Sequence, residues 1–491
     1  MKISTLFKRS GIKFPSEKIS GANDFEVKGI TCNSDCVREG FIFVAIKGNL
    51  LDGSRFLPQA VAKGASAVLL EGKIPVFTQD NKTIAVKVKD ARLALARLSA
   101  EFYGNPCRKI KVVGVTGTNG KTTVTYLIEE ILRQAGYAAG VIGTVNYRFC
   151  HKFIPAKNTT PEPVQLQSLL SQMRNAGCKF CIMEVSSHAL DQERIEGIDF
   201  HSAIFTNLTQ DHLDYHRTME NYFQAKCKIF RRLKKGAFAI INNDDSYAQR
   251  IKKMTSAEVV TYGLGENADI QACNLRLSRD GIEFQLKTKQ DSAVLRSRLI
   301  GIHNVYNILA AVAWARETGI KIAAIQQAIR DFPGVPGRLE RINAKTQFSI
   351  FVDYAHTEDA LRNVLCNLRQ ICEGKIITVF GCGGDRDKSK RPKMGRVVSE
   401  MADYAIITND NPRSESPSSI IADIRKGISG RNFRVITDRR KAILKSLSLA
   451  KPQDIVLIAG KGHENYQIIK DKVLHFDDRE VVRECLEYLK Y

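Results

Sequence analysis

The chain has 491 residues, a length that suggests about three domains, and apolar residues make up 44% of it. Lysine and arginine outnumber aspartate and glutamate by 74 to 52, which gives a formal net charge of +22. Such an excess can indicate nucleic-acid binding, but the basic residues are spread along the chain without an RNA-binding or helix-turn-helix pattern. We therefore expect no nucleic-acid partner, and we interpret the charge as one that attracts small anionic substrates.

Neither end of the chain carries an apolar segment approaching the ~18 residues that a membrane span requires, and "MKISTLFKRSG" has no signal-like apolar core. We expect a cytoplasmic protein that acts as a monomer and inserts into no membrane. The 12 cysteines are scattered, and the close pair Cys178 and Cys181 has no second pair to complete a zinc site. This spacing favours buried thiols over metal or redox chemistry.

Apolar strand-like runs alternate with amphipathic helix-like runs through most of the chain, which predicts an α/β fold with parallel sheets. The first block extends to about residue 100, the second begins at "KVVGVTG" and ends near the turn-rich "FPGVPGR", and the third follows. Polar loops are expected at the carboxyl ends of the strands, where such sheets bind ligands. The clearest predicted strands are 41–48, 66–72, 83–88, 111–117, 348–356, 375–381, 404–410 and 454–462, and helices are predicted at 91–104 and 124–136.

The stretch "GVTGTNGKTT", residues 114–123, lies between a predicted strand and a predicted helix. Gly117 and Gly120 permit close backbone approach to a phosphate, Lys121 supplies a charge, and Thr122 supplies a hydroxyl for magnesium. The usual loop has a further glycine five residues before the second one, whereas this chain has Val115 there. The loop predicts nucleotide binding, and the alternative is a structural turn.

Oxygen ligands for magnesium are expected at strand ends near this loop. "CIMEVSSH" places Glu184 after a buried-looking strand, and "AIFTNLTQDHLDYH" places Asp211, His212 and Asp214 after another. Any one of these residues alone could simply cap the end of a strand and have no metal-binding role. Together with the loop they favour a metal-nucleotide site.

The series "GVTGTNGKTT", "NTTP", "MEVSSHALDQERI", "TNLTQDHLDYH", "YFQAKCKIF", "GIHNVYN", "PGRLE" and "VDYAH" resembles, in this order, the motifs of the Mur ligase family. These enzymes form amide bonds with ATP in peptidoglycan synthesis, and their phosphate loop has the GTNGKT form. The resemblance implies three domains: an N-terminal UDP-sugar-binding domain at 1–100, a central P-loop ATPase domain at 101–333, and a C-terminal Rossmann-like, amino-acid-binding domain at 334–491.

The resemblance also implies an acyl phosphate formed from ATP, with Mg²⁺ neutralising charge. Lys121, Glu184, His212 and Lys226 would be catalytic, and Thr122, Glu184, His212 and Lys226 would hold the metal. ATP would be bound by Gly117, Thr118, Asn119, Gly120, Lys121, Thr122, Thr123, Asn304, Asn307, Arg338 and Asp353.

Lys226 has two interpretations. From its neighbours Lys228, Arg231 and Arg232 alone, it would lie on a solvated helix face. Its position nevertheless matches the family lysine that carries a carbamate, an anionic group that can bind a second magnesium. We expect a carbamate on Lys226.

The loop "DNPR" at 410–413 resembles the signature of family members that add meso-2,6-diaminopimelate to UDP-N-acetylmuramoyl-L-alanyl-D-glutamate. Diaminopimelate carries a distal carboxylate that lysine lacks, and Arg413 could meet that carboxylate with two hydrogen bonds. From local chemistry alone the segment could be a helix-starting turn with Ser414 as its cap. The resemblance places Arg386, Asp410, Asn411, Pro412, Arg413, Gly460 and Glu464 at the diaminopimelate site.

For the UDP-sugar-peptide, the matching positions are Ser34, Asn158, Thr159, Thr160, Ser186, Gln192 and Arg194. The first block departs from the family pattern, because "CNSDC" has Asp35 where relatives usually have arginine. This departure affects Ser34 and the uridine contacts, while the ATP and amino-acid positions keep the family pattern.

Four alternatives stay open at this point. The same ligase could accept L-lysine, which Arg413 argues against, or the chain could resemble folylpolyglutamate synthetase, which would not be expected to carry DNPR. A nucleotide-gated binding protein would release phosphate without needing both acceptor and amine. A nucleic-acid-stimulated P-loop protein would show a steep salt dependence.

Overall fold

A computed structural model describes residues 1–13, 24–48, 51–74, 83–289 and 291–490. The chain forms two compact units. One contains Met1–Gln271 and Asn307–Ile325, and the other contains Ala272–Tyr306 and Gln326–Tyr491. In the described parts of the chain, no helix has both the length and the apolar character that crossing a bilayer requires.

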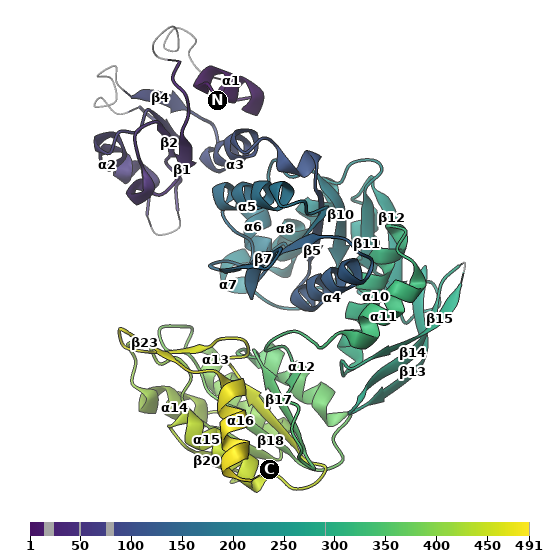
Figure 1. The fold of residues 1–491 in the computed structure, drawn as a ribbon. Helices are drawn as coiled ribbons and strands as arrows, with labels where there is room; N and C mark the ends of the chain where they lie inside the picture. Colours follow the sequence, from purple (N-terminus) through teal and green to yellow (C-terminus); the bar gives the residue numbers. More distant parts are fainter. Residues whose placement is uncertain (14–23, 49–50, 75–82, 290, 491) are drawn as a thin grey trace. The chain divides into compact units, whose positions relative to one another are not determined.

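The first unit begins with a small parallel sheet in the order β1-β2-β3-β4 (Figure 1). The predicted strands and the predicted helix at 91–104 are present here. Apolar side chains fill both faces of the sheet, with Ile42, Val44 and Leu69 on one face and Phe43 and Val68 on the other. The elements are α1 Ile3–Ser10, β1 Gly29–Thr31, β2 Phe41–Val44, α2 Leu57–Ala62, β3 Ala67–Leu70, β4 Ile84–Lys87 and α3 Ala91–Phe102.

The main sheet of the first unit has the order β12-β11-β10-β5-β9-β6-β7-β8. Strands β12 to β6 are parallel, whereas β7 and β8 are antiparallel additions at one edge. Helices α5 and α8 contribute to one core on one face of the sheet, and α4 lies on the other face (Figure 1). The elements are β5 Lys111–Thr116, α4 Lys121–Gln134, β6 Ala139–Ile142, β7 Asn146–Phe149, β8 Lys152–Pro155, α5 Pro163–Asn175, β9 Phe180–Glu184, α6 Ser187–Asp191, β10 Phe200–Phe205, α7 Leu213–His216, α8 Met219–Arg231, β11 Phe238–Asn242, α9 Ala248–Lys252 and β12 Glu258–Gly263.

Five further elements follow β12 along the chain, where it passes between the two units. β13 begins beside β12 at Ile270 and continues into the second unit, where β14 and β15 form an antiparallel hairpin. The segment 332–338 contains no helix, as its prolines and glycines predict. The elements are β13 Ile270–Ser278, β14 Gly281–Lys287, β15 Ser292–Ser297, α10 Ile302–Glu317 and α11 Ile322–Asp331.

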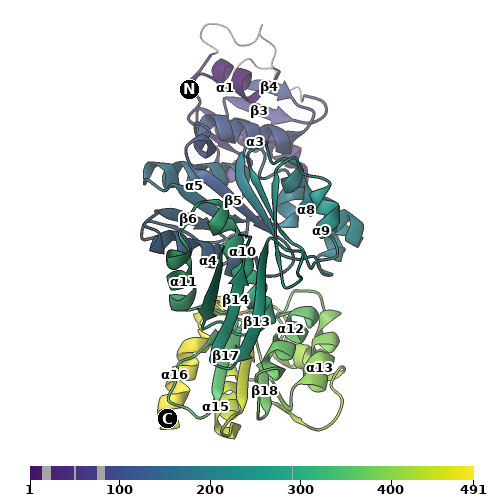
Figure 2. The same ribbon diagram turned by 90° about the vertical axis from the view of Figure 1, so that its right-hand side faces the viewer.

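The second unit is built on a six-stranded sheet in the order β16-β17-β21-β18-β19-β20. All neighbouring pairs except β16–β17 are parallel, and the two faces carry separate cores. Figure 2 shows α15 and α16 on one side of β17 and β18, and α12 and α13 on the other. The elements are β16 Glu340–Arg341, β17 Ser349–Asp353, α12 Glu358–Arg369, β18 Ile376–Phe380, α13 Lys390–Met401, β19 Tyr404–Ile407, α14 Pro417–Arg425, β20 Phe433–Val435, α15 Arg439–Leu449, β21 Ile455–Ala459, β22 Tyr466–Ile469, β23 Lys472–His475 and α16 Asp478–Tyr488.

Candidate functional site

The loop between β5 and α4 has the geometry of a phosphate-binding turn. Gly117 and Gly120 have φ values of 148° and 86°, which favour glycine, and α4 begins at Lys121 with no side chain capping its amides. Val115 is buried within β5, between its partners Glu184 and Ile204. The position that is glycine in the common loop is therefore part of strand β5 in this chain, and the turn begins after β5, at Gly117.

Hydrogen bonds hold this loop in place. The Nζ of Lys121 donates to the carbonyls of Gly117 at 2.9 Å and Thr118 at 2.7 Å. The Thr118 hydroxyl donates to the carbonyl of Thr209 and lies 3.2 Å from the phenol oxygen of Tyr222, while the amide of Asn119 donates to the Asn207 side chain. A preformed loop of this kind can receive phosphate oxygens on the amides at the start of α4.

Substitution of Gly117 by alanine is expected to destabilise the first unit and to weaken ATP binding. An added Cβ would lie closer than 3.0 Å to Thr206 Oγ1, and the φ of 148° would strain any side chain. We expect a loss of about 3 kcal/mol in the free energy of unfolding. Gly136→Ala is the matched control, because its φ of 77° is also positive but nothing lies within 4 Å of the new Cβ. Equal effects of the two substitutions on unfolding and on ATP affinity would show that the close contact at Gly117 is unimportant.

Glu184 lies at the end of β9 and is 1% exposed. Its Oε2 accepts hydrogen bonds from the hydroxyls of Thr122 and Thr144, both at 3.0 Å, and its Oε1 accepts from the Thr144 amide at 2.9 Å. The structure thus brings together two of the predicted metal ligands, and it adds Thr144, which the sequence did not suggest. A buried carboxylate beside a hydroxyl at the start of α4 is an oxygen donor set of the kind that Mg²⁺ prefers.

His212 lies in the long loop after β10 rather than at the strand end, and its φ is 52°. Its Nε2 is 3.4 Å from Asp211 Oδ2, and its ring packs edge-on against His188 at 4.8 Å. Burial lowers the pKa of His212, which favours the neutral ring, the form that binds metals. Within the described residues, no group of three His, Cys, Asp or Glu side chains could by itself hold a metal ion.

Lys226 is 2% exposed, on the face of α8 that also buries Tyr222, Phe223 and Phe230. The solvated-face interpretation of this lysine is therefore wrong. Lys226 is three or four residues from Tyr222, Phe223 and Phe230 along the helix, so all four lie on the same buried face, whereas Arg231 lies on the exposed face. Its Nζ donates to the carbonyl of Gly117 at 2.7 Å and lies 4.6 Å from the centre of the Tyr222 ring. Burial first, and the charge of Lys121 second, hold the pKa of Lys226 well below its usual value.

The predicted sugar-peptide residues of the first unit gather around the end of β9. The Thr160 hydroxyl donates to the Glu184 carbonyl at 2.8 Å and accepts from the Ser186 amide. Arg194 donates to the Thr160 carbonyl and to Gln192 Oε1. The remaining contacts join Thr159 to Thr144 and Asn158 to Tyr147.

Ser34 lies instead in the small N-terminal sheet region, in a short turn where Asn33 accepts from the Asp35 amide. The Asp35 carboxylate accepts from Gln59 at 3.1 Å and from Lys63 at 3.3 Å. In place of the family arginine, the chain therefore has a carboxylate already paired with a lysine.

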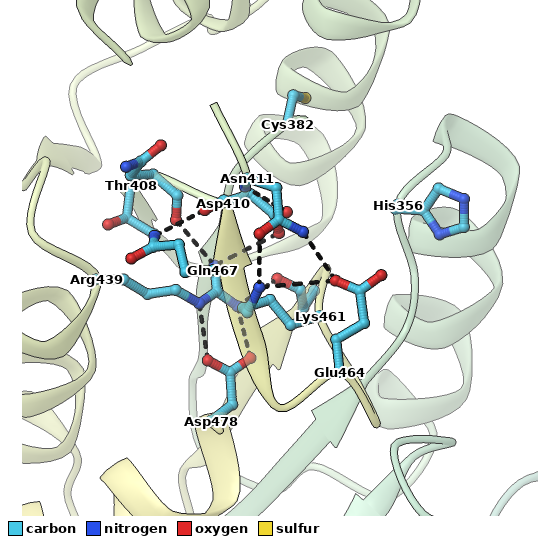
Figure 3. A network of polar contacts seen from close by, with 12 residues as sticks. His356, Cys382, Thr408, Asp410, Asn411, Arg439, Lys461, Glu464, Gln467 and Asp478 are labelled. Atoms are coloured by element: carbon cyan, nitrogen blue, oxygen red, sulfur yellow. Dashed lines mark hydrogen bonds and ion pairs between the residues drawn. The ribbon is translucent and has the colours of Figure 1, made fainter. Parts of the chain in front are cut away.

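The DNPR loop of the second unit is part of a buried polar network (Figure 3). Asn411 joins three partners: its Oδ1 accepts from Lys461 Nζ at 3.1 Å and from the Ile468 amide, and its Nδ2 donates to Glu464 at 2.9 Å. Burial raises the pKa of Glu464, although Lys461 opposes that shift. The loops after β19 and β21, which are 50 residues apart in sequence, are thereby held together.

Asp410 lies beside the buried ion pair of Arg439 and Asp478. Arg439 donates to both carboxylate oxygens of Asp478, at 2.8 and 2.7 Å, and its Nη1 lies 3.9 Å from Asp410 Oδ2 (Figure 3). Among the described residues, Asp410 Oδ2 is a buried oxygen with no hydrogen-bond partner. Gly460, with φ of 119°, leaves space there that a Cβ would fill at 2.6 Å from this oxygen. The arrangement can accept a hydrogen-bond donor from a ligand.

Arg413 has a φ of 52°, and its amide donates to the Ile468 carbonyl. Its Nη1 donates to the Gly384 carbonyl at 2.8 Å, in the loop that carries the exposed Arg386. The proposed cap at Ser414 is wrong: α14 begins at Pro417 after Ser416, and the Ser414 hydroxyl donates to Asp385 at 2.6 Å. Pro412 lies buried between Asn411 and Arg413.

Replacing Lys461 by methionine is expected to destabilise the second unit by about 3 kcal/mol, because the change removes one partner of a buried charged network. Lys461 is fully buried, and its Nζ contacts Asn411 and lies 3.6 Å from Glu464. Lys426→Met is the matched control, since Lys426 makes an exposed pair with Asp423 whose loss costs about 0.5 kcal/mol. Thermal unfolding of the two variants compares them. A Lys461→Met protein as stable as the control would show that the network does not stabilise the two loops.

The other predicted ATP residues are divided between the two units, although Asn304 and Asn307 both belong to α10. Asn307 belongs to the first unit, where its Oδ1 lies against Gly120. In the second unit, Asn304 donates to the Ile300 carbonyl, and Asp353 accepts from the amides of Leu339 and Ala355. Burial raises the pKa of Asp353, and Arg338 opposes that rise. The Arg338 guanidinium lies 5.1 Å from the Tyr354 ring centre.

Three family models match the chain in order. The Mur ligase family, catalytic domain, covers residues 26–103; the Mur ligase middle domain covers 115–315; and the Mur ligase, glutamate ligase domain covers 337–462. A UDP-N-acetylmuramoyl-L-alanyl-D-glutamate--2,6-diaminopimelate ligase of Clostridium botulinum is 43% identical over 467 residues, which are 95% of this chain and 96% of that protein. The enzyme with the same name from Geobacter metallireducens is 45% identical, and the match covers 95% of each chain.

Solved structures agree with these matches. A structure of a UDP-N-acetylmuramoyl-L-alanyl-D-glutamate--2,6-diaminopimelate ligase has a TM-score of 0.69 at 35% identity and covers 95% of this chain and 96% of its own. A MurF ligase from Thermotoga maritima in complex with ADP shares the fold at 20% identity, with a TM-score of 0.62, and covers 96% of this chain and 99% of its own. The motifs, the α/β architecture and these likenesses agree, and the chain belongs to the Mur ligase family.

Proposed function

We propose that this chain is an ATP-dependent ligase that joins meso-2,6-diaminopimelate to the D-glutamate of UDP-N-acetylmuramoyl-L-alanyl-D-glutamate during peptidoglycan precursor synthesis. The observation that carries the amino-acid assignment is the network in which Asn411 contacts both Lys461 and Glu464 (Figure 3). Asp410 and Arg413 belong to the same loop as Asn411. Relatives that are 41–45% identical over nearly the whole chain carry the name of this reaction. A lysine-adding ligase would have no use for a guanidinium that recognises a distal carboxylate.

The reaction has two steps. A carboxylate oxygen of the acceptor attacks the γ-phosphorus of ATP, which releases ADP and leaves an acyl phosphate. The amine of diaminopimelate then attacks the acyl carbon, loses a proton, and displaces inorganic phosphate. Neither step needs a covalent bond to the enzyme, so the side chains act by position and charge.

The first unit would bind the triphosphate. Its loop amides and Lys121 would hold the phosphates, and Thr122, Glu184 and His212 would hold Mg²⁺, which neutralises the charge that develops on the phosphate oxygens. Asn304, Asn307, Arg338 and Asp353 would contact ATP. Asn158, Thr159, Thr160, Ser186, Gln192 and Arg194 would bind the sugar-peptide, with Ser34 at its uridine end.

Lys226 would carry a carbamate. Burial lowers the pKa of Lys226 and so favours its neutral amine, the form that attacks carbon dioxide, forming a carbamate and releasing one proton. The product replaces a buried neutral amine by an anion next to the phosphate loop. This anion would be a further metal ligand beside Thr122 and Glu184.

The amino-acid site would lie in the second unit. The guanidinium groups of Arg413 and Arg386 would meet the distal carboxylate of diaminopimelate, and Asp410 and Glu464 would accept from its ammonium group. We further propose that residues 1–100, 101–333 and 334–491 act as the sugar-binding, ATP-binding and amino-acid-binding domains. The chain would work as a cytoplasmic monomer without a nucleic-acid partner.

Phosphate release tests the reaction type. With ATP and Mg²⁺ present, release should require both the UDP-muramoyl dipeptide and meso-diaminopimelate, and it should be slow when either is omitted. A rate of phosphate release that is the same with and without both substrates would favour a nucleotide-gated binding protein instead. Release stimulated by nucleic acid and steeply sensitive to salt would favour the nucleic-acid alternative.

A further inference from the structure

Two cysteines lie in contact at an edge of the first unit, outside the candidate site. Cys150 is in the turn between β7 and β8, Cys178 lies just before β9, and their Sγ atoms are 3.9 Å apart. Cys150 is exposed, whereas Cys178 is 4% exposed. We propose that Cys150 and Cys178 form a reversible disulfide when the chain meets a small-molecule disulfide.

The sheet itself brings these cysteines together. β6 lies between β7 and β9, and its Gly140 pairs with Phe149 on one side and with Cys181 on the other. The turn after Phe149 and the segment before β9 therefore reach the same end of three neighbouring strands. The contact follows from strand register and does not depend on a chance orientation of two surface side chains.

The backbone at Cys150 is that of a tight hairpin. Phe149 pairs with Lys152, and the two residues between them, Cys150 and His151, have φ values of 43° and 64°. Two-residue hairpin turns with positive φ usually contain asparagine or glycine. Here the turn presents a thiol to solvent. A disulfide needs a separation of about 2.05 Å between the sulfur atoms, which side-chain rotation at an exposed turn can supply.

The chemistry starts at Cys150 because it is the accessible thiol. Its thiolate attacks the small disulfide, forming a mixed disulfide and expelling one small thiolate. Cys178 then loses its proton and attacks Cys150 Sγ, and the second small thiol leaves. Both protein thiols are oxidised, and the small disulfide is reduced to two thiols.

Cys178 is suited to the second step and not to the first. Burial, and next the neighbouring Cys150, raise the pKa of Cys178 to about 12, which makes it a poor direct target for an oxidant in solution. Once Cys150 has become a mixed disulfide, its charge no longer opposes a thiolate at Cys178, while burial still raises the pKa of Cys178. The contact between the two sulfur atoms, 3.9 Å apart, therefore favours the second step. Cys178 then has an electrophilic sulfur in contact with it.

The crosslink would lie away from the phosphate site. Cys178 precedes the start of β9, while Glu184 lies at the other end of that strand. Oxidation would tie the β7–β8 hairpin to the sheet without reaching the ATP loop. We therefore expect unchanged ATP turnover. We also expect a higher midpoint of thermal unfolding, because the crosslink lowers the conformational entropy of the unfolded chain.

The test incubates the folded, reduced full-length chain with oxidised glutathione, blocks the remaining thiols, and maps peptides by mass without reduction. The expected product is a peptide pair linked through Cys150 and Cys178, which dithiothreitol abolishes. The exposed cysteines Cys36 and Cys366 should carry glutathione alone. Oxidised wild type should unfold at a higher temperature than reduced wild type.

Variants separate the proposal from general oxidation. Cys150→Ser should lose the linkage and the thermal shift while keeping its reduced-state stability, and Cys178→Ser should stop at a glutathione adduct on Cys150. Cys366→Ser is the matched control and should behave as wild type. Wild-type protein that accumulates only a stable glutathione adduct on Cys150, or that links Cys150 to another cysteine, would overturn the proposal. Since ATP turnover is not the readout, this result is independent of the proposed ligase reaction.

Discussion

Lys226→Ala is expected to lower the ligation rate by a factor of about 10³ or more. The side chain is buried, contacts the phosphate loop at Gly117, and would supply an anionic metal ligand once it carries a carbamate. Lys228→Ala is the matched control on the same helix, because the amine of Lys228 makes partly exposed pairs with Asp191 and Glu193. That control should stay close to wild type.

Two measurements separate the carbamate from a plain structural lysine. Short carboxylic acids such as acetate should partly restore Lys226→Ala, because they can place a carboxylate in the space left by the side chain. Wild-type protein in ¹³C-labelled carbon dioxide should show a carbamate carbon signal that Lys226→Ala lacks. Active wild-type protein that shows no carbamate signal, together with a Lys226→Ala variant that acetate does not restore, would contradict the modification.

Arg413→Ala is expected to reduce kcat/KM for meso-diaminopimelate by a factor on the order of 10³, while the already low value for L-lysine changes little. The guanidinium is oriented by its hydrogen bond to the Gly384 carbonyl, so Arg413→Lys should also fail to restore discrimination despite its charge. Arg434→Ala, at an exposed position of β20, is the control and should leave both values unchanged. Equal losses for both amino acids would mean that Arg413 stabilises the loop without selecting the substrate.

The sequence predicted the parallel strands, the phosphate loop and the strand-end position of Glu184, because each depends on a local pattern. β5, the loop and α4 follow one another directly in sequence, so the spacing of Gly117, Gly120 and Lys121 was enough to predict the phosphate loop. The antiparallel hairpins were not predicted. β7, β8, β22 and β23 are four residues each, too short to show a clear period.

The contacts that build the sites depend on long-range packing. Thr144 contacts Glu184, 40 residues away in sequence, because β6 and β9 are neighbouring strands. A single threonine belongs to no sequence motif that would predict this contact. The Arg439–Asp478 pair joins two helices on one face of the second sheet. For Lys226, local charge suggested solvent, whereas the apolar spacing of α8 buries it.

A competition experiment tests the proposed amino-acid substrate most directly. The chain is given ATP, Mg²⁺ and UDP-N-acetylmuramoyl-L-alanyl-D-glutamate together with equal concentrations of meso-diaminopimelate and L-lysine, and the product is identified by mass. A ligase selective for diaminopimelate should make the diaminopimelate tripeptide almost exclusively, with one ADP and one phosphate released for each product. A lysine tripeptide in comparable amount, or phosphate release without any tripeptide, would contradict it.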